Sequence, residues 1–350
     1  MSVKSVRIQD VARAAGVSTA TVSRALSNPE LVAKETRDSV QEAIRTTGYR
    51  LNRAARNLRR MQAGAVLVLV PNLGNPFFSQ ILAGISAGFA RSDRSVLIAD
   101  TCDLPQTSRR LVDYFLDARV DGMISLDGGL GQEELAQLAA HDLSERLVFA
   151  CEWAAGASSM SVRSDNAGGA RAAVRHLHDL GHRRIAHVTG PVDNVLTQVR
   201  RDAVLDERSR LALPVHDDWI IRGDFSLDSG HAAAQRILQM QDRPTAVFCA
   251  SDMVAFGLIA GLTQGGLRVP EDISVVGFDD IEQSAHFIPA LTTIRQNRRR
   301  IGLRAAEVLL DRLKHEQAHS DDAPTKSNAT SVDIVDVELV IRASSGPVAS

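Results

Sequence analysis

The chain has 350 residues, of which 44% are hydrophobic and 23% charged, so it is long enough for two or three domains and ordinary for a globular protein. Three widely spaced cysteines exclude a disulfide framework or a Cys zinc site, and without a signal peptide or an apolar run of membrane-spanning length we expect a cytoplasmic protein. The net charge of −2 conceals an asymmetry. Residues 1–60 carry twelve Lys and Arg against five Asp and Glu, a net charge of +7, which leaves −9 for the rest of the chain. Such an asymmetry indicates that a polyanion binds to the N-terminal part only.

The first thirty residues predict two short helices joined by a tight turn, a helix-turn-helix. One apolar helix face, with spacing i, i+3, i+4 and i+7, is formed by Ile8, Val11, Ala12 and Ala15. Gly16 ends this helix, and Ser18 can cap the next one by accepting a hydrogen bond from a free backbone N–H. The second helix presents small outward residues that can enter the major groove of DNA. Its candidate DNA contacts are Ser18, Thr19, Ala20, Thr21, Ser23, Arg24 and Ser27.

These candidates fall into two groups, those expected to contact bases and those expected to contact phosphates. Arg24 can reach a guanine edge with two donors, whereas a phosphate contact is its alternative. Thr19 and Ala20 suit base edges or a thymine methyl group. The hydroxyl-bearing candidates suit phosphate; they are Ser18, Thr21, Ser23 and Ser27.

A third helix is expected over residues 34–47, ended by Gly48, and a basic linker follows over residues 49–62. Asn52 can cap a short linker helix over residues 53–60, but an isolated helix of this length is marginal in water. We therefore expect it to order only against a partner, and its basic residues indicate that the partner is DNA. The linker candidates for DNA contact are Asn52, Ala55, Arg56, Leu58 and Arg59.

From residue 65 onward, short apolar runs alternate with helical segments. The expected strands are residues 65–70, 96–99, 122–126, 147–151, 185–189, 219–221, 246–249 and 274–278, with a further β-like run over 335–341. The expected helices are residues 77–91, 106–118, 132–141, 167–180, 195–211, 228–240 and 253–264. Residues 319–331 are expected to form a surface loop, and Cys102, Cys151 and Cys249 to be buried thiols near strand ends. This alternation predicts two lobes with parallel sheets covered on both faces, and a ligand crevice at the carboxyl ends of the strands.

Side chains at the expected strand ends are candidates for binding a small molecule. Asp252 and Asp279 suit ligand hydroxyls, with helix capping the alternative for Asp252. Arg200 can donate two hydrogen bonds to a ligand oxygen or base. Asp165 and Glu152 lie near the expected crossover between lobes, where they either bind ligand or hold the hinge. The aromatic candidates are Phe77, Phe78, Trp153 and Phe225, with a core position the alternative for at least one of the first two.

Signatures of catalysis and of metal binding are missing from the sequence. His176, His178, His182 and His187 crowd one region, but their spacing places them on different faces, so no metal site is expected. The chain has no Gly-x-x-x-x-Gly-Lys-Ser/Thr, His-Glu-x-x-His or Gly-x-Ser-x-Gly motif, and its glycine pairs fit no dinucleotide fingerprint. We therefore expect no catalytic residue and no cofactor.

Taken in order, the motifs resemble the bacterial lactose/galactose-repressor family along nearly the whole chain. The matching runs include residues 10–26, Gly48-Tyr49, Asn75-Pro-Phe-Phe-Ser79, Leu180-Gly-His-Arg-Arg-Ile185, Pro244-Thr-Ala-Val-Phe248, Val276-Gly-Phe-Asp279 and Pro289-Ala-Leu-Thr-Thr293. Within that family the chain is most similar to the nucleoside-sensing (cytidine-type) repressors, through residues 68–72, 76–79, 152, 222–225 and 248–252. Two departures stand out: Leu51 replaces the usual Pro after Gly-Tyr-X, and residues 201–204 read Arg-Asp-Ala-Val where the family prefers Gly and then an aromatic residue.

The resemblance implies an all-α helix-turn-helix head followed by an α/β, two-lobed, periplasmic-binding-protein-like core with parallel sheets. The implied domains are a head over residues 1–48, a hinge helix or linker over 49–63, and an effector-binding and dimerisation core over 64–343. The implied N-subdomain covers about 64–162 and 292–318, and the C-subdomain about 163–290 and 330–343. The resemblance further implies that Leu58 inserts between base pairs beside its symmetry mate, and Ala55 would let the two hinge helices approach closely. Packing of Leu58 against the core is the alternative.

We therefore expect a homodimeric transcriptional regulator, a repressor in the first instance, that binds a near-palindromic double-stranded DNA operator and no membrane. A small-molecule effector, a nucleoside, purine or sugar, is expected between the lobes of the core. The alternative is a small-molecule binding protein, or a sugar- or nucleoside-processing enzyme, with an accessory DNA-binding head. Turnover of such a compound would favour the enzyme.

Overall fold

The computed structural model describes residues 6–49, 57, 62–102, 111–154, 156–157, 159–318 and 331–348. The chain forms two compact units, Met1–Gln62 and Ala63–Ser350, which we call the head and the core. The expected surface loop over residues 319–331 falls, apart from Ser331, outside the described residues. None of the described helices is long and apolar enough to cross a membrane.

Over residues 6–49, the head is a three-helix unit. Its helices are α1 (Ile8–Ala15), α2 (Thr19–Ser27) and α3 (Lys34–Thr47), with a short 3-10 turn, η1 (Pro29–Leu31). Gly16 ends α1 with φ +66°, a left-handed conformation that favours glycine. Ser18 caps α2, because its Oγ accepts the Thr21 backbone N–H at 3.0 Å. Apolar residues of all three helices make one small core: Val11, Ala12, Val22, Ala25, Val40 and Ala43.

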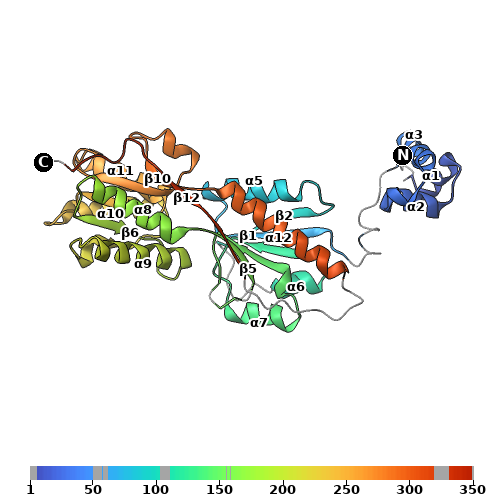
Figure 1. Cartoon of the computed structure of the whole chain (residues 1–350), viewed down its shortest axis with the longest axis horizontal. Helices are drawn as coiled ribbons and strands as arrows, with labels where there is room; N and C mark the ends of the chain where they lie inside the picture. The colour runs from blue at the N-terminus through green and yellow to red at the C-terminus, as the bar shows by residue number, and fades with distance from the viewer. Residues whose placement is uncertain are drawn as a thin grey trace, which may run out of the picture. The chain divides into compact units, whose positions relative to one another are not determined.

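The first lobe of the core is a six-stranded sheet of order β11-β5-β4-β3-β1-β2 in which all pairs are parallel (Figure 1). Its strands are β1 (Ala65–Val70), β2 (Ser95–Asp100), β3 (Gly122–Ser125), β4 (Leu147–Ala150), β5 (Met160–Ser164) and β11 (Val332–Val335). Its helices are α5 (Phe77–Phe89), α6 (Leu111–Leu116), α7 (Gln132–Ala140) and α12 (Arg298–Ala318), with η3 (Ser144–Arg146). Alternate residues of β1 belong to two different cores: Val66 and Val68 pack with α5 and α12, and Leu67 and Leu69 with α6 and α7.

Helices α5 and α12 touch at glycines. A Cβ at Gly302 would lie 2.0 Å from the carbonyl oxygen of Ile81, and one at Gly84 would lie 2.2 Å from that of Arg299. Only glycine permits this approach, which brings the backbones of α5 and α12 into direct contact.

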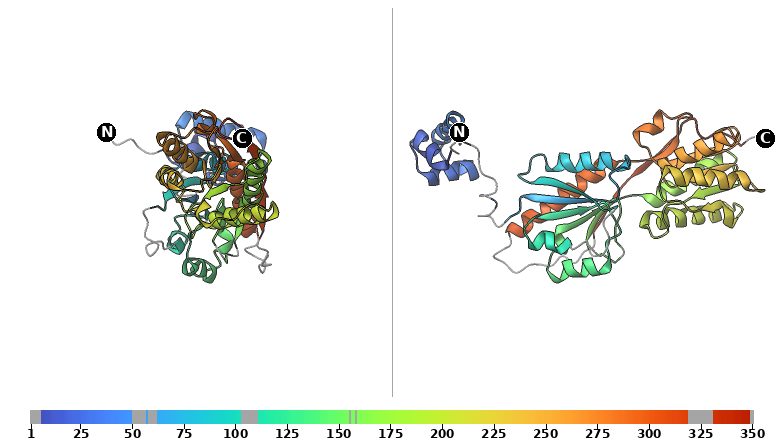
Figure 2. Two further views of the ribbon diagram at one scale, coloured as in Figure 1. Left: turned by 90° about the vertical axis from the view of Figure 1, so that its left-hand side faces the viewer. Right: turned by 180° about the vertical axis from the view of Figure 1, so that it is seen from behind.

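The second lobe repeats the plan with a sheet of order β12-β10-β9-β8-β6-β7, in which only the pairing of β12 with β10 is antiparallel. Its strands are β6 (Ile185–Val188), β7 (Ile220–Ile221), β8 (Ala246–Cys249), β9 (Ser274–Asp279), β10 (Thr292–Gln296) and β12 (Val337–Val340). Its helices are α8 (Asn166–Asp179), α9 (Val195–Arg210), α10 (Leu227–Gln239) and α11 (Asp252–Gln264), with η4 (Asp217–Trp219) and η5 (Glu282–Ala285). Helices α8 and α9 cover one face, and α10 and α11 pack together on the other (Figure 2).

Three connections join the lobes: β5 to α8, β10 to α12, and β11 to β12. The expected return to the first lobe near residue 292 is too early, because β10 pairs with β9 and β12 in the second sheet and the chain crosses only after Gln296. The expected second-lobe segment from residue 330 likewise begins too early, because β11 pairs with β5 in the first sheet. Apolar alternation identifies a strand but does not say which of two sheets it joins.

Two smaller expectations are also wrong. Trp219 does not lie in a strand but ends η4, where its Nε1–H donates to the carbonyl oxygen of Asp242 at 3.1 Å. Cys151 and Cys249 are buried, but Cys102 is exposed. The apolar run of β2 suggested burial, yet β2 is an edge strand, and its residues Leu97 and Ile98 are about half exposed.

Candidate functional site

The outward face of α2 carries the candidate DNA contacts of the head. Ser18, Thr19, Ala20, Arg24 and Ser27 are exposed, and Thr21 and Ser23 are half-buried. Val22 and Ala25 face the head core, which fixes the orientation of the helix. Arg24 makes no ion pair with any described residue, so its guanidinium is available to an external acceptor. The Ser18 and Ser27 hydroxyls already bond within the helix, to Thr21 and to the Ser23 carbonyl oxygen.

The linker candidates lie outside the described residues. They are Asn52, Ala55, Arg56, Leu58 and Arg59. Their contacts with DNA stay predictions from the sequence.

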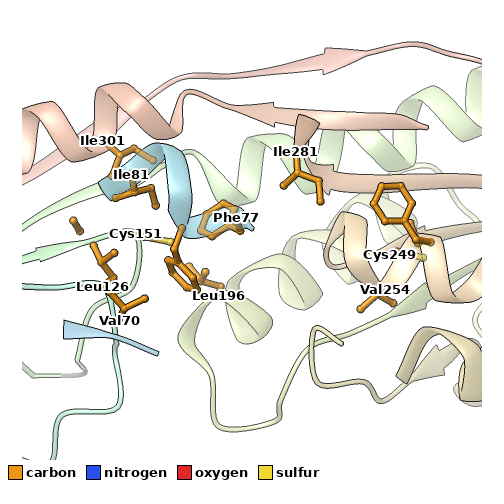
Figure 3. Close-up of a cluster of buried hydrophobic side chains, with 14 of the residues drawn as sticks. Val70, Phe77, Ile81, Leu126, Cys151, Leu196, Cys249, Val254, Ile281 and Ile301 are labelled. Atoms are coloured by element: carbon orange, nitrogen blue, oxygen red, sulfur yellow. The ribbon is translucent and has the colours of Figure 1, made fainter. Parts of the chain in front are cut away.

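In the core, the carboxyl ends of β1, β4, β6 and β9 lie where the two lobes meet. Phe77, Cys151 and Leu196, which follow β1, β4 and β6, belong to one buried apolar cluster that draws on both lobes (Figure 3). Polar residues follow the same strands, so the junction of the lobes brings together groups far apart in sequence, such as Glu152 and Asn194.

Glu152, directly after β4, connects the lobes. Its Oε1 accepts a hydrogen bond from Nδ2 of Asn194 at 2.9 Å, and its Oε2 accepts one from the backbone N–H of Gly128 at 3.0 Å. Asn194 in turn caps α9 through Oδ1, which accepts the Leu196 N–H at 2.9 Å. Burial raises the pKa of Glu152, and these two hydrogen bonds oppose that rise. Glu152 therefore links the first lobe to the second through Asn194, the residue that caps α9.

Arg200 of α9 is almost completely buried in the second lobe. Its Nε donates to Oδ1 of Asn166 at 2.9 Å, its Nη1 donates to the carbonyl oxygen of Ala250, and its Cζ lies 3.8 Å from the centroid of the Phe278 ring. Burial lowers the pKa of Arg200, and the negative charge that most strongly opposes this lowering is that of Asp279. The guanidinium of Arg200 is thus held in place inside the second lobe by Asn166, Ala250 and Phe278.

Asp279 ends β9 with an unusual backbone, φ +129°, and is 5% exposed. Nε2 of Gln296 donates to its Oδ1 at 2.7 Å. Burial raises the pKa of Asp279 from 3.8 to about 7, against the positive charge of Arg200. Desolvation together with a specific charged partner is typical of a functional site.

Asp252 has a different role. Its carboxylate accepts hydrogen bonds from the Ile281 N–H at 2.9 Å and the Ser284 hydroxyl at 2.6 Å, and from the Thr293 hydroxyl at 2.5 Å. These bonds hold the turn after β9 against β10. Helix capping, the alternative expected for Asp252, falls instead to Ser251, whose Oγ accepts the Val254 N–H at 3.2 Å.

Asp165 lies on the crossover from β5 to α8. Its Oδ1 accepts the Gly168 N–H at 2.8 Å as the cap of α8, and its backbone N–H donates to the Val335 carbonyl oxygen at 3.0 Å. Asp165 therefore joins the connection from β5 to α8 with the connection from β11 to β12 by a backbone hydrogen bond.

The aromatic candidates come from both lobes, and Phe77 and Phe78 are members of the buried apolar core. Phe77 and Phe78 are buried and meet edge to face, with ring centroids 5.1 Å apart. Trp153 is half-buried beneath the guanidinium of Arg163, 3.7 Å from its ring centroid. Phe225 is half-buried with φ +68°, and its ring lies so close to Gly190 that a Cβ there would come 2.2 Å from its Cζ.

Sequence reasoning missed Arg298, the first residue of α12. Its Nη1 donates to the carbonyl oxygen of Phe77 at 3.3 Å, in the first lobe, and its Nη2 to that of Asp280 at 2.9 Å, in the second. The missed strand β10 directly precedes it, so no expected strand end drew attention to this position. Asn194 was missed too, although an Asn just before an expected helix is a capping signal.

The region where the lobes meet therefore holds carboxylates, a guanidinium, amides and aromatic rings, most of them buried. Such groups are of the kinds that line small-molecule sites. Among the described residues, no group of three or more His, Cys, Asp or Glu is placed to hold a metal ion.

Comparison with known proteins places this geometry in context. A family model described as bacterial regulatory proteins, lacI family, matches residues 7–52, and one described as a periplasmic binding protein-like domain matches residues 174–345. The HTH-type transcriptional repressor CytR of Escherichia coli K12 is 36% identical over 337 residues, 96% of this chain and 95% of that protein. The repressor PurR of Vibrio cholerae is 35% identical over 311 residues, 89% and 92% of the two chains. The crystal structure of the Lac repressor dimer bound to operator and the anti-inducer ONPF superposes with a TM-score of 0.81 and 31% identity, covering 98% of this chain and all of that one.

Proposed function

The chain belongs to the lacI family of bacterial regulatory proteins, and from this membership we propose that it is a transcriptional repressor whose operator affinity is set by a small molecule bound between the lobes of its core. One observation supports the proposal: a single chain combines an exposed face of α2, the second helix of a helix-turn-helix, with a two-lobed core whose buried charged residues include Glu152, bonded across the lobes to Asn194, and Asp279. The repressor acts in the cytoplasm, where its DNA lies.

The DNA-bound form is a homodimer on a near-palindromic operator. A protein two-fold axis presents two copies of α2 to successive major grooves, and the symmetry of the DNA site follows from that of the protein. The Lac repressor structure, a dimer bound to operator, supports this assembly. Leu97 and Ile98 on the edge strand β2 are exposed apolar residues that suit a protein contact.

Replacing Arg24 with Ala is expected to relax base preference at one position of each operator half-site, with a loss of about 1–3 kcal/mol. The physical reason is the loss of a two-pronged donor that forms no ion pair with any described residue. Selection of bound sequences from a randomised duplex pool measures the preference, and Arg45→Ala, on the exposed face of α3, is the control. An unchanged preference for Arg24→Ala would make Arg24 a phosphate contact instead.

The effector is a nucleoside, purine or sugar. Asp279 accepts its hydroxyl or amine donors, the positive charge of Arg200 favours the ionised form of Asp279, and Phe77, Phe78 and Phe225 cover its ring. Glu152 and Trp153 close the site from the first lobe, and Asp165 keeps the crossover in place. Asp252 contributes through the turn that it holds. A thermal-shift screen of nucleosides, purines and sugars tests this, because a ligand specific to the native state raises the melting temperature.

Without effector, the free energy of unfolding is expected to fall as the pH rises from about 4 to about 7. The folded pKa of Asp279, about 7, lies above its ordinary 3.8, so across this window the folded protein keeps a proton that the unfolded chain releases. The loss attributable to this group approaches about 1.4 kcal/mol per pH unit at most. Urea unfolding at pH 5 and pH 8 checks it, with Asp279→Asn as the comparison. Equal pH slopes for the two proteins would contradict the buried-carboxyl account.

The competing function, a binding protein or a sugar- or nucleoside-processing enzyme with an accessory head, predicts turnover or DNA binding that ignores the ligand. The repressor relatives weigh against it. Incubating the protein with whichever compound the screen identifies, and analysing the products chemically, separates the two: a repressor returns the compound unchanged.

A further inference from the structure

The carboxylate of Asp121 holds the first residues of the core, where the basic linker ends. The core begins at Ala63, and its first strand, β1, begins at Ala65. Oδ1 of Asp121 accepts the backbone N–H of Ala63 at 2.7 Å, and its Oδ2 accepts that of Gly64 at 3.0 Å. The two oxygens of one side chain therefore bind two consecutive backbone N–H groups. Gly64 has φ +70°, a left-handed conformation that favours glycine and lets successive N–H groups converge on one anion.

Arg94 compensates the buried charge of Asp121. Its Nε donates to Oδ2 of Asp121 at 3.1 Å, and the two side chains are only 14% and 10% exposed. With Arg94, three N–H donors meet at this carboxylate. A carboxylate accepts from all three, whereas the amide of an Asn would turn an NH₂ group toward one of them. The position therefore requires an acceptor that has no donor of its own.

Three neighbouring strands begin around this carboxylate. Gly64 directly precedes β1, Arg94 directly precedes β2 and Asp121 directly precedes β3, and β1 pairs in parallel with both of the others. The cluster thus lies at the amino ends of the strands, whereas the carboxyl ends of the first sheet face the second lobe (Figure 1). The length of β1, about 20 Å, separates the two ends of the sheet.

The same strands lead to residues at the junction of the lobes. β1 is followed by Phe77 at the start of α5, and β3 by Gly128, whose N–H binds Glu152. When domains rotate, each packed lobe moves as one body. A displacement of the first lobe at the junction therefore carries Asp121, and the residues that it holds, along with the strands.

We propose that Asp121 is a positioning residue, which fixes the end of the DNA-binding linker to the first lobe so that operator recognition depends on this carboxylate. The inference rests on the proposed function. Two half-sites at a fixed spacing are recognised together only if the linkers of a dimer leave their cores in a defined direction. Without the carboxylate, Ala63 and Gly64 lose a common partner and the linker pivots. Operator affinity then falls, whereas binding to random DNA, which depends on phosphate contacts, persists.

The test compares the full-length protein with Asp121→Asn and Asp121→Glu, by fluorescence anisotropy on the selected duplex and on a random-sequence duplex. In Asp121→Asn, the ratio of the two affinities is expected to fall about fivefold or more, the size of a lost hydrogen bond. Asp121→Glu is expected to retain more of that ratio, because it stays a carboxylate. A role in packing alone predicts the reverse order, since Asn conserves volume and Glu overpacks the site.

Hydrogen–deuterium exchange tests the anchor itself. The amides of residues 63–64 are expected to exchange faster in Asp121→Asn, while those of β1 stay protected. The matched control is Asp117→Asn, because Asp117 lies in the same connection between α6 and β3 but is half exposed and pairs with Arg119 at 2.8 Å. This control is expected to change the affinity ratio less than about twofold, as is typical of exposed ion pairs.

The proposal is overturned if Asp121→Asn keeps the affinity ratio, if it keeps more of the ratio than Asp121→Glu, or if exchange at residues 63–64 is unchanged. Should circular dichroism show Asp121→Asn to be unfolded, Arg94→Gln takes its place. That variant removes only the ion pair and is expected to lower the ratio about twofold or more, because a buried charge loses its partner; an unchanged ratio again contradicts the anchor. Lack of any preferred duplex for the unchanged protein would contradict the proposed function, whereas a preferred duplex that Asp121→Asn binds equally well would contradict only this inference.

Discussion

Replacing Asp279 with Ala is expected to weaken effector binding by about 100-fold, while operator affinity without effector stays unchanged. The carboxyl group is buried, oriented by Gln296 and backed by Arg200. A ligand that donates to it loses a charge-assisted hydrogen bond, and Arg200 loses the negative charge that most strongly opposes the lowering of its pKa. Removing one partner of a buried charged pair typically costs about 2–5 kcal/mol. Calorimetric titration with the identified effector measures the change.

The Asp279→Asn variant is the matched control for this prediction. Ala at φ +129° is strained, whereas Asn tolerates positive φ better and keeps an oxygen for Gln296. If both variants bind effector as tightly as the unchanged protein, Asp279 lies outside the site. If Ala alone loses binding and is also partly unfolded, the loss is one of stability.

Replacing Leu58 with Ala is expected to reduce specific operator affinity by about 10- to 100-fold and to leave non-specific DNA binding nearly unchanged. This prediction rests on the sequence: Leu58 is an apolar residue between Arg56, Arg59 and Arg60 and needs a place out of water. A side chain wedged between base pairs stabilises bent DNA, which then contacts more protein. Binding to random-sequence DNA depends on phosphate contacts, which Leu58 does not make.

Fluorescence anisotropy with operator and random duplexes at one fixed salt concentration checks the Leu58 prediction. Leu51→Ala removes the same atoms from the same linker, at the position where relatives usually carry Pro, and is expected to have a smaller effect. Equal losses on both duplexes for Leu58→Ala would place Leu58 outside the groove and favour its packing against the core.

The head and most core elements were predictable because their signals are local, whereas β5, β10 and α12 were missed. The spacing of Ile8, Val11 and Ala12, the cap at Ser18 and the break at Gly16 act within a few residues, and the structure confirms the helices that they predict. The fully apolar run of β1 likewise identified a strand buried on both faces.

The lobe boundaries and several site roles were not predictable, because they depend on contacts distant in sequence. β10 carries Thr292 and Thr293, which are polar by composition but fully buried, so no apolar run marked it. Asp252 was expected to bind ligand or cap a helix, yet it holds Ile281, some 30 residues away. Arg298 joins carbonyl groups from two lobes, a role that no local pattern encodes.

The measurement that tests the account most directly is binding of the full-length protein to its selected duplex, with and without the identified effector. We expect tight, salt-sensitive, sequence-selective binding whose affinity changes by about 5- to 150-fold when effector is added, the range of typical allosteric coupling. Indifference of the folded protein to every duplex at low salt would contradict the account, and so would tight operator binding that no cleft ligand alters.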